Sequence, residues 1–255
     1  MQMRFFILLA CVIVLMHGAA VRAAPDEIEV YTEDINAPGE FGLEQHLNYA
    51  INGAKVPDYP GQMISHHVMR ITPEFSYGLS KTLEAGLYIP FALTPDGNFF
   101  LNAMRLRLKY IAPRQEADTM FYGLNVELSR DSLRTSESLS SLELRPIVGY
   151  RDTQWLVSFN PILNAALAAN VNHQVQFEPA LKVAHRAGEE VWGGVEYYGT
   201  YGALSHVLPS SQRGHVVYAV VDAKARGSDI NFGIGRGFNA GDVWVVKAII
   251  ELPLN

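Results

Sequence analysis

The chain has 255 residues, of which 49% are hydrophobic and only 18% are charged, and its net charge is −6. Proteins that bind nucleic acid usually carry a surplus of basic residues, so we expect no nucleic-acid partner and consider small solutes and lipids instead. The single cysteine excludes a disulfide framework and any metal site built from several cysteines.

The first segment of the chain is predicted to be a signal peptide over residues 1–23. Arg4 precedes an apolar run over residues 5–20, and small residues follow around position 23. An uncleaved anchor helix is the alternative interpretation. No later stretch stays apolar for about 18 residues, so no second membrane-spanning helix is expected. The pattern therefore predicts an exported protein.

After residue 40 the sequence alternates between apolar and polar residues with a period of two, which indicates strands with two different faces. Leu124 and Val126, for example, share one face, whereas Asn125 and Glu127 share the other. The strands run to about 10–13 residues, and aromatic residues often end the apolar face, as in transmembrane barrels. A soluble β-sandwich with one wet face is the alternative.

The alternation predicts an all-β fold, an antiparallel transmembrane β-barrel of about twelve strands (range about 10–14) over residues 41–255. The predicted strands lie near residues 41–51, 67–79, 81–92, 99–111, 119–129, 140–150, 153–164, 174–185, 190–201, 215–225, 229–237 and 243–253. Short turns alternate with longer loops, and in outer-membrane barrels the short turns face the periplasm. Residues 24–40 form a segment before the barrel, expected at its periplasmic mouth or inside it.

Several prolines fall inside the predicted strands. Proline has no N–H to donate to a ladder, and a closed barrel has no edge strand to place it on. We therefore expect bulges or strand ends at Pro73, Pro90, Pro146, Pro161 and Pro179.

If the apolar face meets lipid, the polar face lines the interior, where charged side chains avoid hydrocarbon. The side chains predicted to line the lumen are Glu44, His46, Arg70, Glu74, Glu84, Arg105, Arg107, Lys109, Glu127, Glu143, Arg145, Glu178, Lys182, Glu196, Lys247 and Glu251. Both signs of charge occur, often two residues apart on one strand. They either pair across strands and hold the barrel together, or line a solute path of weak ion selectivity.

Three motifs contain residue types that are found in functional sites. His66 and His67 are adjacent, but no other ligand lies at metal-binding spacing. His46 with a serine such as Ser76 is compatible with a membrane-embedded lipid hydrolase, although no motif places the serine. The glycines of 233–237 resemble part of a dinucleotide fingerprint, but no helix is predicted after them. We therefore predict no catalytic residue, no metal and no cofactor, and we do not expect an enzyme.

Several short motifs resemble an outer-membrane barrel family named for the meta-cleavage pathway of phenol degradation. They include Glu33-Asp34, Phe41-Gly42-Leu43-Glu44, Pro73-Glu74-Phe75-Ser76-Tyr77-Gly78-Leu79, Glu84-Ala85-Gly86-Leu87-Tyr88, Gly123-Leu124-Asn125, Glu143-Leu144-Arg145-Pro146 and Asn160-Pro161-Ile162. The resemblance implies an outer-membrane barrel and uptake of apolar or aromatic compounds, and it supplies no catalytic residues. One departure is the end of the chain, Leu252-Pro253-Leu254-Asn255, where many such barrels end in an aromatic residue.

Together these features predict a bacterial outer-membrane barrel that mediates passage of small solutes. The expected partners are membrane lipids, a small-molecule solute and the outer-membrane assembly machinery. A lipid hydrolase and a non-catalytic structural or adhesive barrel remain the alternatives.

Overall fold

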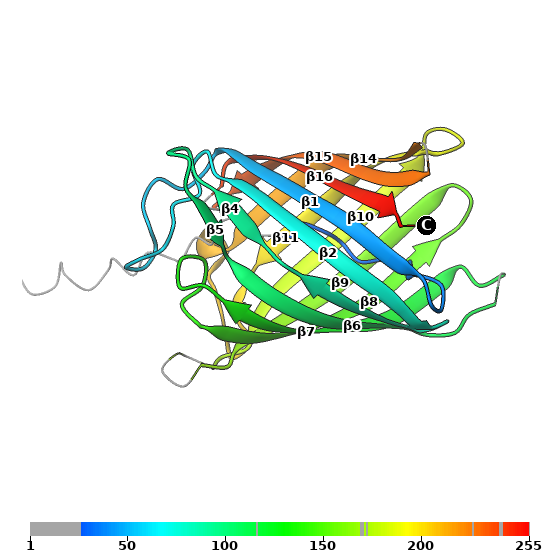
Figure 1. Cartoon of the computed structure of the whole chain (residues 1–255), viewed down its shortest axis with the longest axis horizontal. Helices are drawn as coiled ribbons and strands as arrows, with labels where there is room; N and C mark the ends of the chain where they lie inside the picture. The colour runs from blue at the N-terminus through cyan, green and yellow to red at the C-terminus, as the bar shows by residue number, and fades with distance from the viewer. Residues whose placement is uncertain are drawn as a thin grey trace, which may run out of the picture.

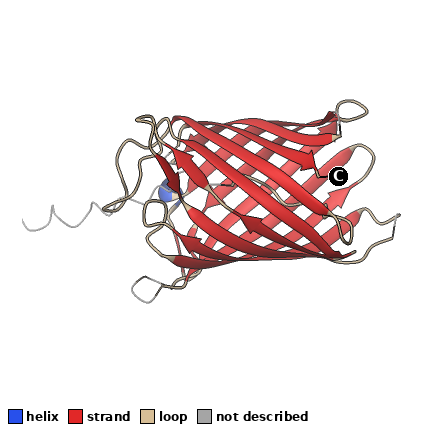
Figure 2. Ribbon diagram, viewed as in Figure 1, coloured by secondary structure: helices blue, strands red, loops and turns tan. Residues whose placement is uncertain are grey.

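The computed structural model describes residues 27–115, 117–168, 171, 173–225, 227–239 and 242–254. The predicted signal peptide lies outside these residues. Long strands wind around a common axis and form a barrel, as Figures 1 and 2 show. In the described part of the chain, no helix has the length and apolar character needed to cross a membrane.

Twelve spans form the wall of the barrel, which confirms the predicted strand number. Ten spans are single strands: β1 (Phe41–Asn52), β2 (Met69–Ser80), β7 (Met120–Asp131), β8 (Ser140–Arg151), β9 (Trp155–Ala166), β10 (Gln176–Arg186), β11 (Val191–Thr200), β14 (Gly214–Ala225), β15 (Ser228–Phe238) and β16 (Trp244–Pro253). The other two are each divided in two, into β3 (Leu83–Tyr88) with β4 (Phe91–Leu93) and β5 (Phe99–Leu101) with β6 (Ala103–Ile111). The loop after β11 carries the short strands β12 (Gly202–Ala203) and β13 (His206–Val207) and the 3-10 turn η1 (Ser210–Gln212).

The sheet closes on itself because β1 pairs with β2 along one edge and with β16 along the other. All neighbouring strands run antiparallel, so each span returns the chain to the opposite end of the barrel. Closure leaves no unpaired sheet edge, which a strand surrounded by lipid requires.

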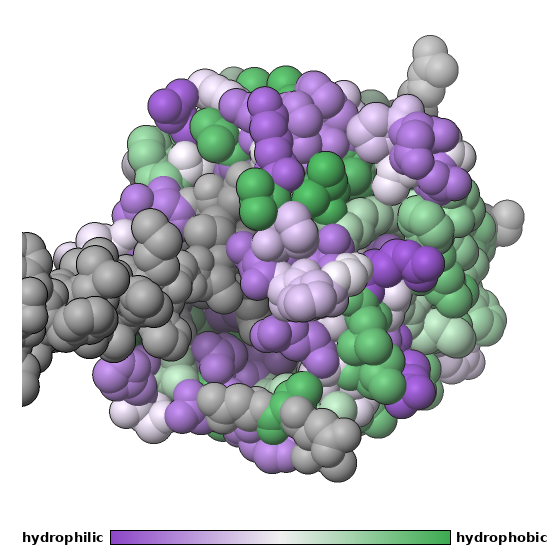
Figure 3. All heavy atoms as spheres, turned by 90° about the vertical axis from the view of Figure 1, so that its left-hand side faces the viewer, coloured by the Kyte–Doolittle hydropathy of each residue, from purple (hydrophilic) through white to green (hydrophobic). Residues whose placement is uncertain are grey.

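The two ends of the barrel differ in the length of their connections. The long connections 53–68, 132–139 and 201–213 lie at one end, on the left of Figure 1, which we call the long-loop end. The opposite, short-turn end carries the tight connections 81–82 and 152–154 together with the C-terminus. Figure 3 looks onto the long-loop end, where hydrophilic residues surround the mouth with hydrophobic residues interspersed.

The two faces of the wall follow the predicted alternation. Leu106 and Leu124 point outward and are 61% and 40% exposed, whereas their chain neighbours Arg107 and Asn125 are buried inside. Transmembrane barrels place apolar side chains toward lipid and polar ones inward, and this wall has that arrangement.

The prolines act differently from one another. Pro90 separates β3 from β4, so the single strand predicted over residues 81–92 is wrong and is divided there. Pro73 instead lies within the ladder opposite Gln45, without a bulge at that position. The ladder continues past Pro73 because a strand residue directs its N–H toward only one neighbour.

The inward face of β8 contains a glycine that the packing requires. A Cβ atom on Gly149 would overlap the ring of Phe121, which is itself fully buried. We expect Gly149→Ala to lower the free energy of unfolding by about 1–3 kcal/mol, because an extra carbon in a packed interior forces its neighbours to shift. Urea titration of the refolded barrel, followed by tryptophan fluorescence, measures this change.

Gly193→Ala is the matched control, since a Cβ atom at this position on β11 would meet nothing within 4 Å. It should leave the unfolding midpoint close to that of the wild type. Equal losses for the two alanine variants would contradict the packing explanation.

Candidate functional site

The N-terminal segment, residues 27–40, runs through the barrel toward its short-turn end. It begins beside Val245, near the long-loop end of β16, and its last four residues, 37–40, are exposed. Figure 1 shows this segment in dark blue, enclosed by the strands and leading to the turn before β1 at the short-turn end. Ile28, Val30 and Tyr31 are almost fully buried, with exposed fractions of 2%, 3% and 1%. The segment therefore fills part of the interior that a solute would have to cross.

Side chains of the wall form hydrogen bonds with the backbone N–H and C=O groups of this segment. The Tyr31 N–H donates to Asn160 Oδ1 (2.7 Å), and the Tyr31 carbonyl accepts from Ser158 Oγ (2.5 Å) and Asn160 Nδ2 (3.1 Å). On the opposite wall, Lys247 Nζ donates to the Ile28 carbonyl at 2.8 Å. Buried backbone groups need partners, and here side chains supply them in place of a strand ladder.

Further contacts hold the segment near the short-turn end. The Asn36 N–H donates to Glu84 Oε2 (2.6 Å), and Asn36 Nδ2 donates to Ser76 Oγ (2.7 Å). Lys109 Nζ donates to the carbonyl of Asp34 at 2.7 Å. The segment is thus bound by several strands rather than by one.

The acidic pair Glu33 and Asp34 meets two arginines at this end. Arg151 lies 2.7 Å from Glu33 Oε1 and 2.8 Å from Asp34 Oδ2, and Arg114 lies 3.1 Å from the same Glu33 oxygen. Burial raises the pKa of the Glu33 carboxyl, the negative charge of Asp34 adds to the rise, and the arginines oppose it.

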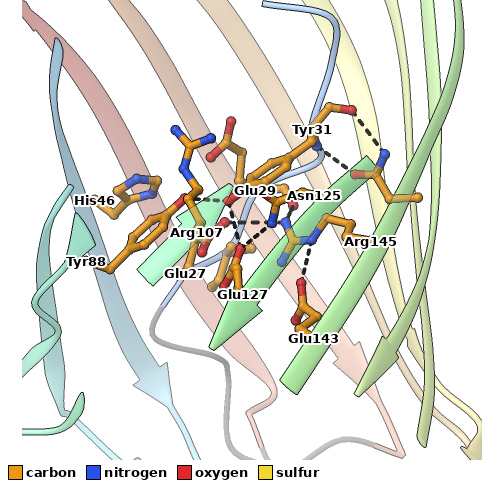
Figure 4. A network of polar contacts seen from close by, with 12 residues as sticks. Glu27, Glu29, Tyr31, His46, Tyr88, Arg107, Asn125, Glu127, Glu143 and Arg145 are labelled. Atoms are coloured by element: carbon orange, nitrogen blue, oxygen red, sulfur yellow. Dashed lines mark hydrogen bonds and ion pairs between the residues drawn. The ribbon is translucent and has the colours of Figure 1, made fainter. Parts of the chain in front are cut away.

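A network of charges lies in the middle of the lumen, as Figure 4 shows. Arg107 donates through Nε to Glu74 Oε1 (2.6 Å) and through Nη2 to Glu84 Oε1 (2.7 Å). Glu74 also meets His46 Nε2 at 3.1 Å. All four side chains are buried, so Arg107 neutralises carboxylates that water does not reach.

Tyr31 connects the segment to this network. Its hydroxyl is hydrogen-bonded to the Tyr88 hydroxyl and donates to Glu127 Oε1 at 3.2 Å. Asn125 Nδ2 donates to the same Glu127 oxygen at 2.7 Å, and the guanidinium carbon of Arg145 lies 4.1 Å from the centre of the Tyr31 ring. Cations favour the face of an aromatic ring, so both the main chain and the ring of Tyr31 are held.

Arg145 joins the wall to the beginning of the segment. It donates to Glu143 Oε1 on its own strand (2.8 Å) and to Glu27 Oε1 (3.3 Å) and the Glu29 carbonyl (3.4 Å) of the segment. These contacts extend from the ring of Tyr31 to Glu27.

A second ionic cluster lies on the wall formed by β10, β11, β14 and β16. Lys182 lies 2.8 Å from Asp222 and 3.3 Å from Glu196, and Lys247 forms an ion pair with the same glutamate. Tyr198 donates a hydrogen bond to Glu196 at 2.7 Å. The charges near Lys182 are therefore satisfied within the wall.

Apolar side chains also gather inside the barrel around the segment. Tyr31 packs in a cluster with Ile111, Phe121, Ile147, Leu156 and Ala184. Val30 packs with Ile162 and Ala180, and Ile28 with Tyr218, Val220 and Val245. The apolar residues of the segment thus fill apolar surfaces of the wall in an interior that also holds many charges.

The structure buries most of the side chains predicted to line the lumen. The buried ones are His46, Arg70, Glu74, Glu84, Arg107, Lys109, Glu127, Arg145, Lys182, Glu196 and Lys247. The partly exposed ones are Glu44, Arg105, Glu143, Glu178 and Glu251.

Sequence reasoning did not single out Glu27, Tyr31 or Tyr88. Tyr88 has the same parity as Glu84, so the alternation contains the signal that places it inside. Glu27 and Tyr31 lie in a segment that forms no strand, and no periodicity indicates which side chains of such a segment are buried.

The structure bears on the hydrolase alternative, and it also brings a group of possible metal ligands together around His46. Ser76 is hydrogen-bonded to Asn36, whereas His46 is engaged with Glu74, so these two residues do not form a nucleophile and base pair. Glu29, Glu44, His46 and Glu74 each bring one ligand atom to within 4.8 Å of the others. Because Glu74 already pairs with both His46 and Arg107, we assign no metal ion to this group.

No family model and no curated protein matches the sequence. Among solved structures, the chain is similar to an outer membrane channel from Pseudomonas putida F1, with 12% identity and a TM-score of 0.59 over 86% of this chain and 96% of that one. A membrane protein from work on in-meso crystallization gives 10% identity and a TM-score of 0.50 over 84% of both chains. A bacterial polysaccharide outer membrane secretin gives 8% identity and a TM-score of 0.46, over 86% of this chain and 100% of that one. At this level of identity the likeness establishes the fold, an antiparallel twelve-stranded barrel of the outer-membrane type.

Proposed function

We propose that this barrel mediates the passage of small apolar or aromatic solutes across a bacterial outer membrane, with the N-terminal segment as an internal gate. The observation that carries the proposal is the position of the segment, which fills the lumen with Ile28, Val30 and Tyr31 against apolar patches of the wall. Moving the segment would uncover these patches, and apolar surface favours apolar ligands.

The charges of the lumen support an apolar solute rather than an ion. Selective ion pathways present rings of one charge or free carbonyl groups. Here Arg107, Arg145 and Lys182 are each paired with carboxylates. The resemblance to the barrels named for phenol degradation agrees with an aromatic solute.

The proposed setting follows from the ends of the barrel. Short turns face the periplasm in outer-membrane barrels. The C-terminus and the junction of the segment with β1 lie at the short-turn end, where an exported chain arrives. We propose membrane lipids and the outer-membrane assembly machinery as partners, after removal of residues 1–23.

Uptake of two probes by cells with a lipopolysaccharide outer leaflet tests the proposal. The apolar amine 1-N-phenylnaphthylamine fluoresces once it reaches the membrane interior, and nitrocefin reports polar passage through its hydrolysis by a periplasmic β-lactamase. Cells that produce the protein should take up the apolar probe several-fold faster than cells with an empty vector. Nitrocefin hydrolysis should stay unchanged.

Apolar uptake at the vector rate would overturn the proposal and favour a structural barrel with a filled lumen. An equal rise for both probes would also overturn it, in favour of a general diffusion pore. A heat-dependent shift in gel mobility confirms in each case that the barrel is folded.

A further inference from the structure

A row of three prolines crosses the middle of the wall. Pro146 on β8, Pro161 on β9 and Pro179 on β10 occupy one level. Pro161 is directly paired with Pro179, and the constant register of β8 and β9 places Pro146 opposite Pro161. Prolines are rare in central strands because each removes a ladder donor. Three prolines at one level therefore remove three donors from the same part of the wall.

The ladder between β8 and β9 is interrupted at this row. Pairs join Leu144 to Leu163 on one side and Val148 to Phe159 on the other, and none joins the three residues between them on either strand. The same register applies on both sides, so the interruption is a loss of hydrogen bonds and not a bulge.

The direction of the backbone groups explains the interruption. In an antiparallel sheet a residue directs its N–H and C=O to the same neighbouring strand, and this neighbour alternates along the chain. The ladder of β7 with β8 continues through Pro146 opposite Leu124, and that of β9 with β10 continues through Pro161 opposite Pro179. Pro146 and Pro161 therefore face each other with two carbonyl groups and no N–H.

Such a gap is unfavourable in a wall that lipid surrounds. Hydrocarbon offers no hydrogen-bond donors, so a barrel normally satisfies every backbone group between its strands. Here the side chains beside the gap on the outer face, Leu144, Val148 and Phe159, are apolar and exposed. The two carbonyl groups thus lie at a level where the bilayer is apolar.

The inner face behind the gap carries two apolar side chains, Ile147 and Ile162, beside the polar Asn160 and Arg145. Ile147 points inward and packs in the cluster of Tyr31, and Ile162 points inward and packs in the cluster of Val30. Asn160, which the register places opposite Ile147 on the inner face, holds the main chain of Tyr31. The gap therefore lies where the N-terminal segment touches the wall.

We propose that the interrupted ladder between β8 and β9 is a lateral opening, through which apolar solutes pass between the lumen and the bilayer. The inference rests on the proposed function and specifies the route. When the segment moves, the apolar clusters around Ile147 and Ile162 become accessible from inside. The β8–β9 seam, which lacks hydrogen bonds at this level, then separates to let the solute into the membrane.

Restoring the missing donors tests this route. The double variant Pro146→Val/Pro161→Val gains one N–H on each strand. Each new N–H can donate to the carbonyl group of the residue opposite, so the two missing hydrogen bonds can form. We expect the double variant to lose most of the protein-dependent uptake of 1-N-phenylnaphthylamine, and each single variant to lose part of it. Pro73→Val is the matched control because Pro73 also lacks an N–H beside an interrupted ladder, here between β2 and β3, but its carbonyl already accepts from the Ile89 N–H. It should retain wild-type uptake.

A thiol reaction tests the opening without any transport. The only cysteine of the sequence is Cys11, in the predicted signal peptide, so an introduced cysteine is unique in the mature chain. N-(1-pyrenyl)maleimide dissolved in the bilayer should label Ile162→Cys several-fold faster than Val220→Cys. Both native side chains are buried, and Val220 lies in continuous ladders with β11 and β15.

The valine pair should abolish this difference in labelling rate. Equal labelling of the two cysteines in the wild-type background would overturn the lateral opening. So would full uptake of the apolar probe by a folded double variant, while the proposed function would stand. If cells with the wild-type protein took up the apolar probe no faster than vector cells, the proposed function itself would be refuted.

Discussion

Replacing Arg107 by alanine is expected to lower the free energy of unfolding by about 3–5 kcal/mol, because removing one partner of a buried ion pair leaves charge without compensation. Arg107 is 6% exposed and donates to Glu74 and Glu84, which are 1% and 3% exposed. The same glutamates also hold His46 and the main chain of Asn36, so the loss should extend to the N-terminal segment. Urea unfolding in lipid vesicles measures the change.

Arg130→Ala provides the control for Arg107→Ala. Arg130 is exposed near the long-loop end of β7, where water and salt screen its charge. Its removal should leave the unfolding midpoint near the wild-type value. If the two alanine variants were equally stable, the central network would be solvated and would not hold the barrel together.

Removing the side chains that hold Tyr31 is expected to open the lumen. Ser158→Ala with Asn160→Ala deletes three hydrogen bonds to the Tyr31 main chain. At about 1 kcal/mol net for each bond, the bound state of the segment loses about 3 kcal/mol, which corresponds to roughly a hundredfold shift in its population. Planar-bilayer recordings should show steps in current far more often than recordings of the wild type.

Ser129→Ala is the control for this opening. Its hydroxyl is buried on the inward face of β7 and donates to Asp131, away from the segment. The control variant should conduct as the wild type does. A folded double variant that stays as silent as the wild type would show that the hydrogen bonds to Tyr31 do not keep the lumen closed.

Much of the wall was predictable because strand geometry is local. Side chains alternate across a strand with a period of two. Because the outer face meets lipid and the inner face is polar, this alternation appears in the sequence as apolar and polar residues in turn. It correctly separates Leu124 from Asn125 and Leu106 from Arg107. Local geometry did not show how prolines act, since Pro90 divides a strand whereas Pro73 leaves the ladder of β2 with β1 continuous.

The amino-acid sequence by itself determined the fold class, the number of strands and the alternation of apolar and polar faces along them. Only the tertiary structure decided which charges meet, because the registers of β2 with β3 and of β3 with β6 let Arg107 reach Glu74 across the intervening strand. It also decided that the N-terminal segment lies in the lumen, where Tyr31 binds side chains far away in the sequence. The register that aligns Pro146 with Pro161 is likewise a property of paired strands, which neither strand encodes alone.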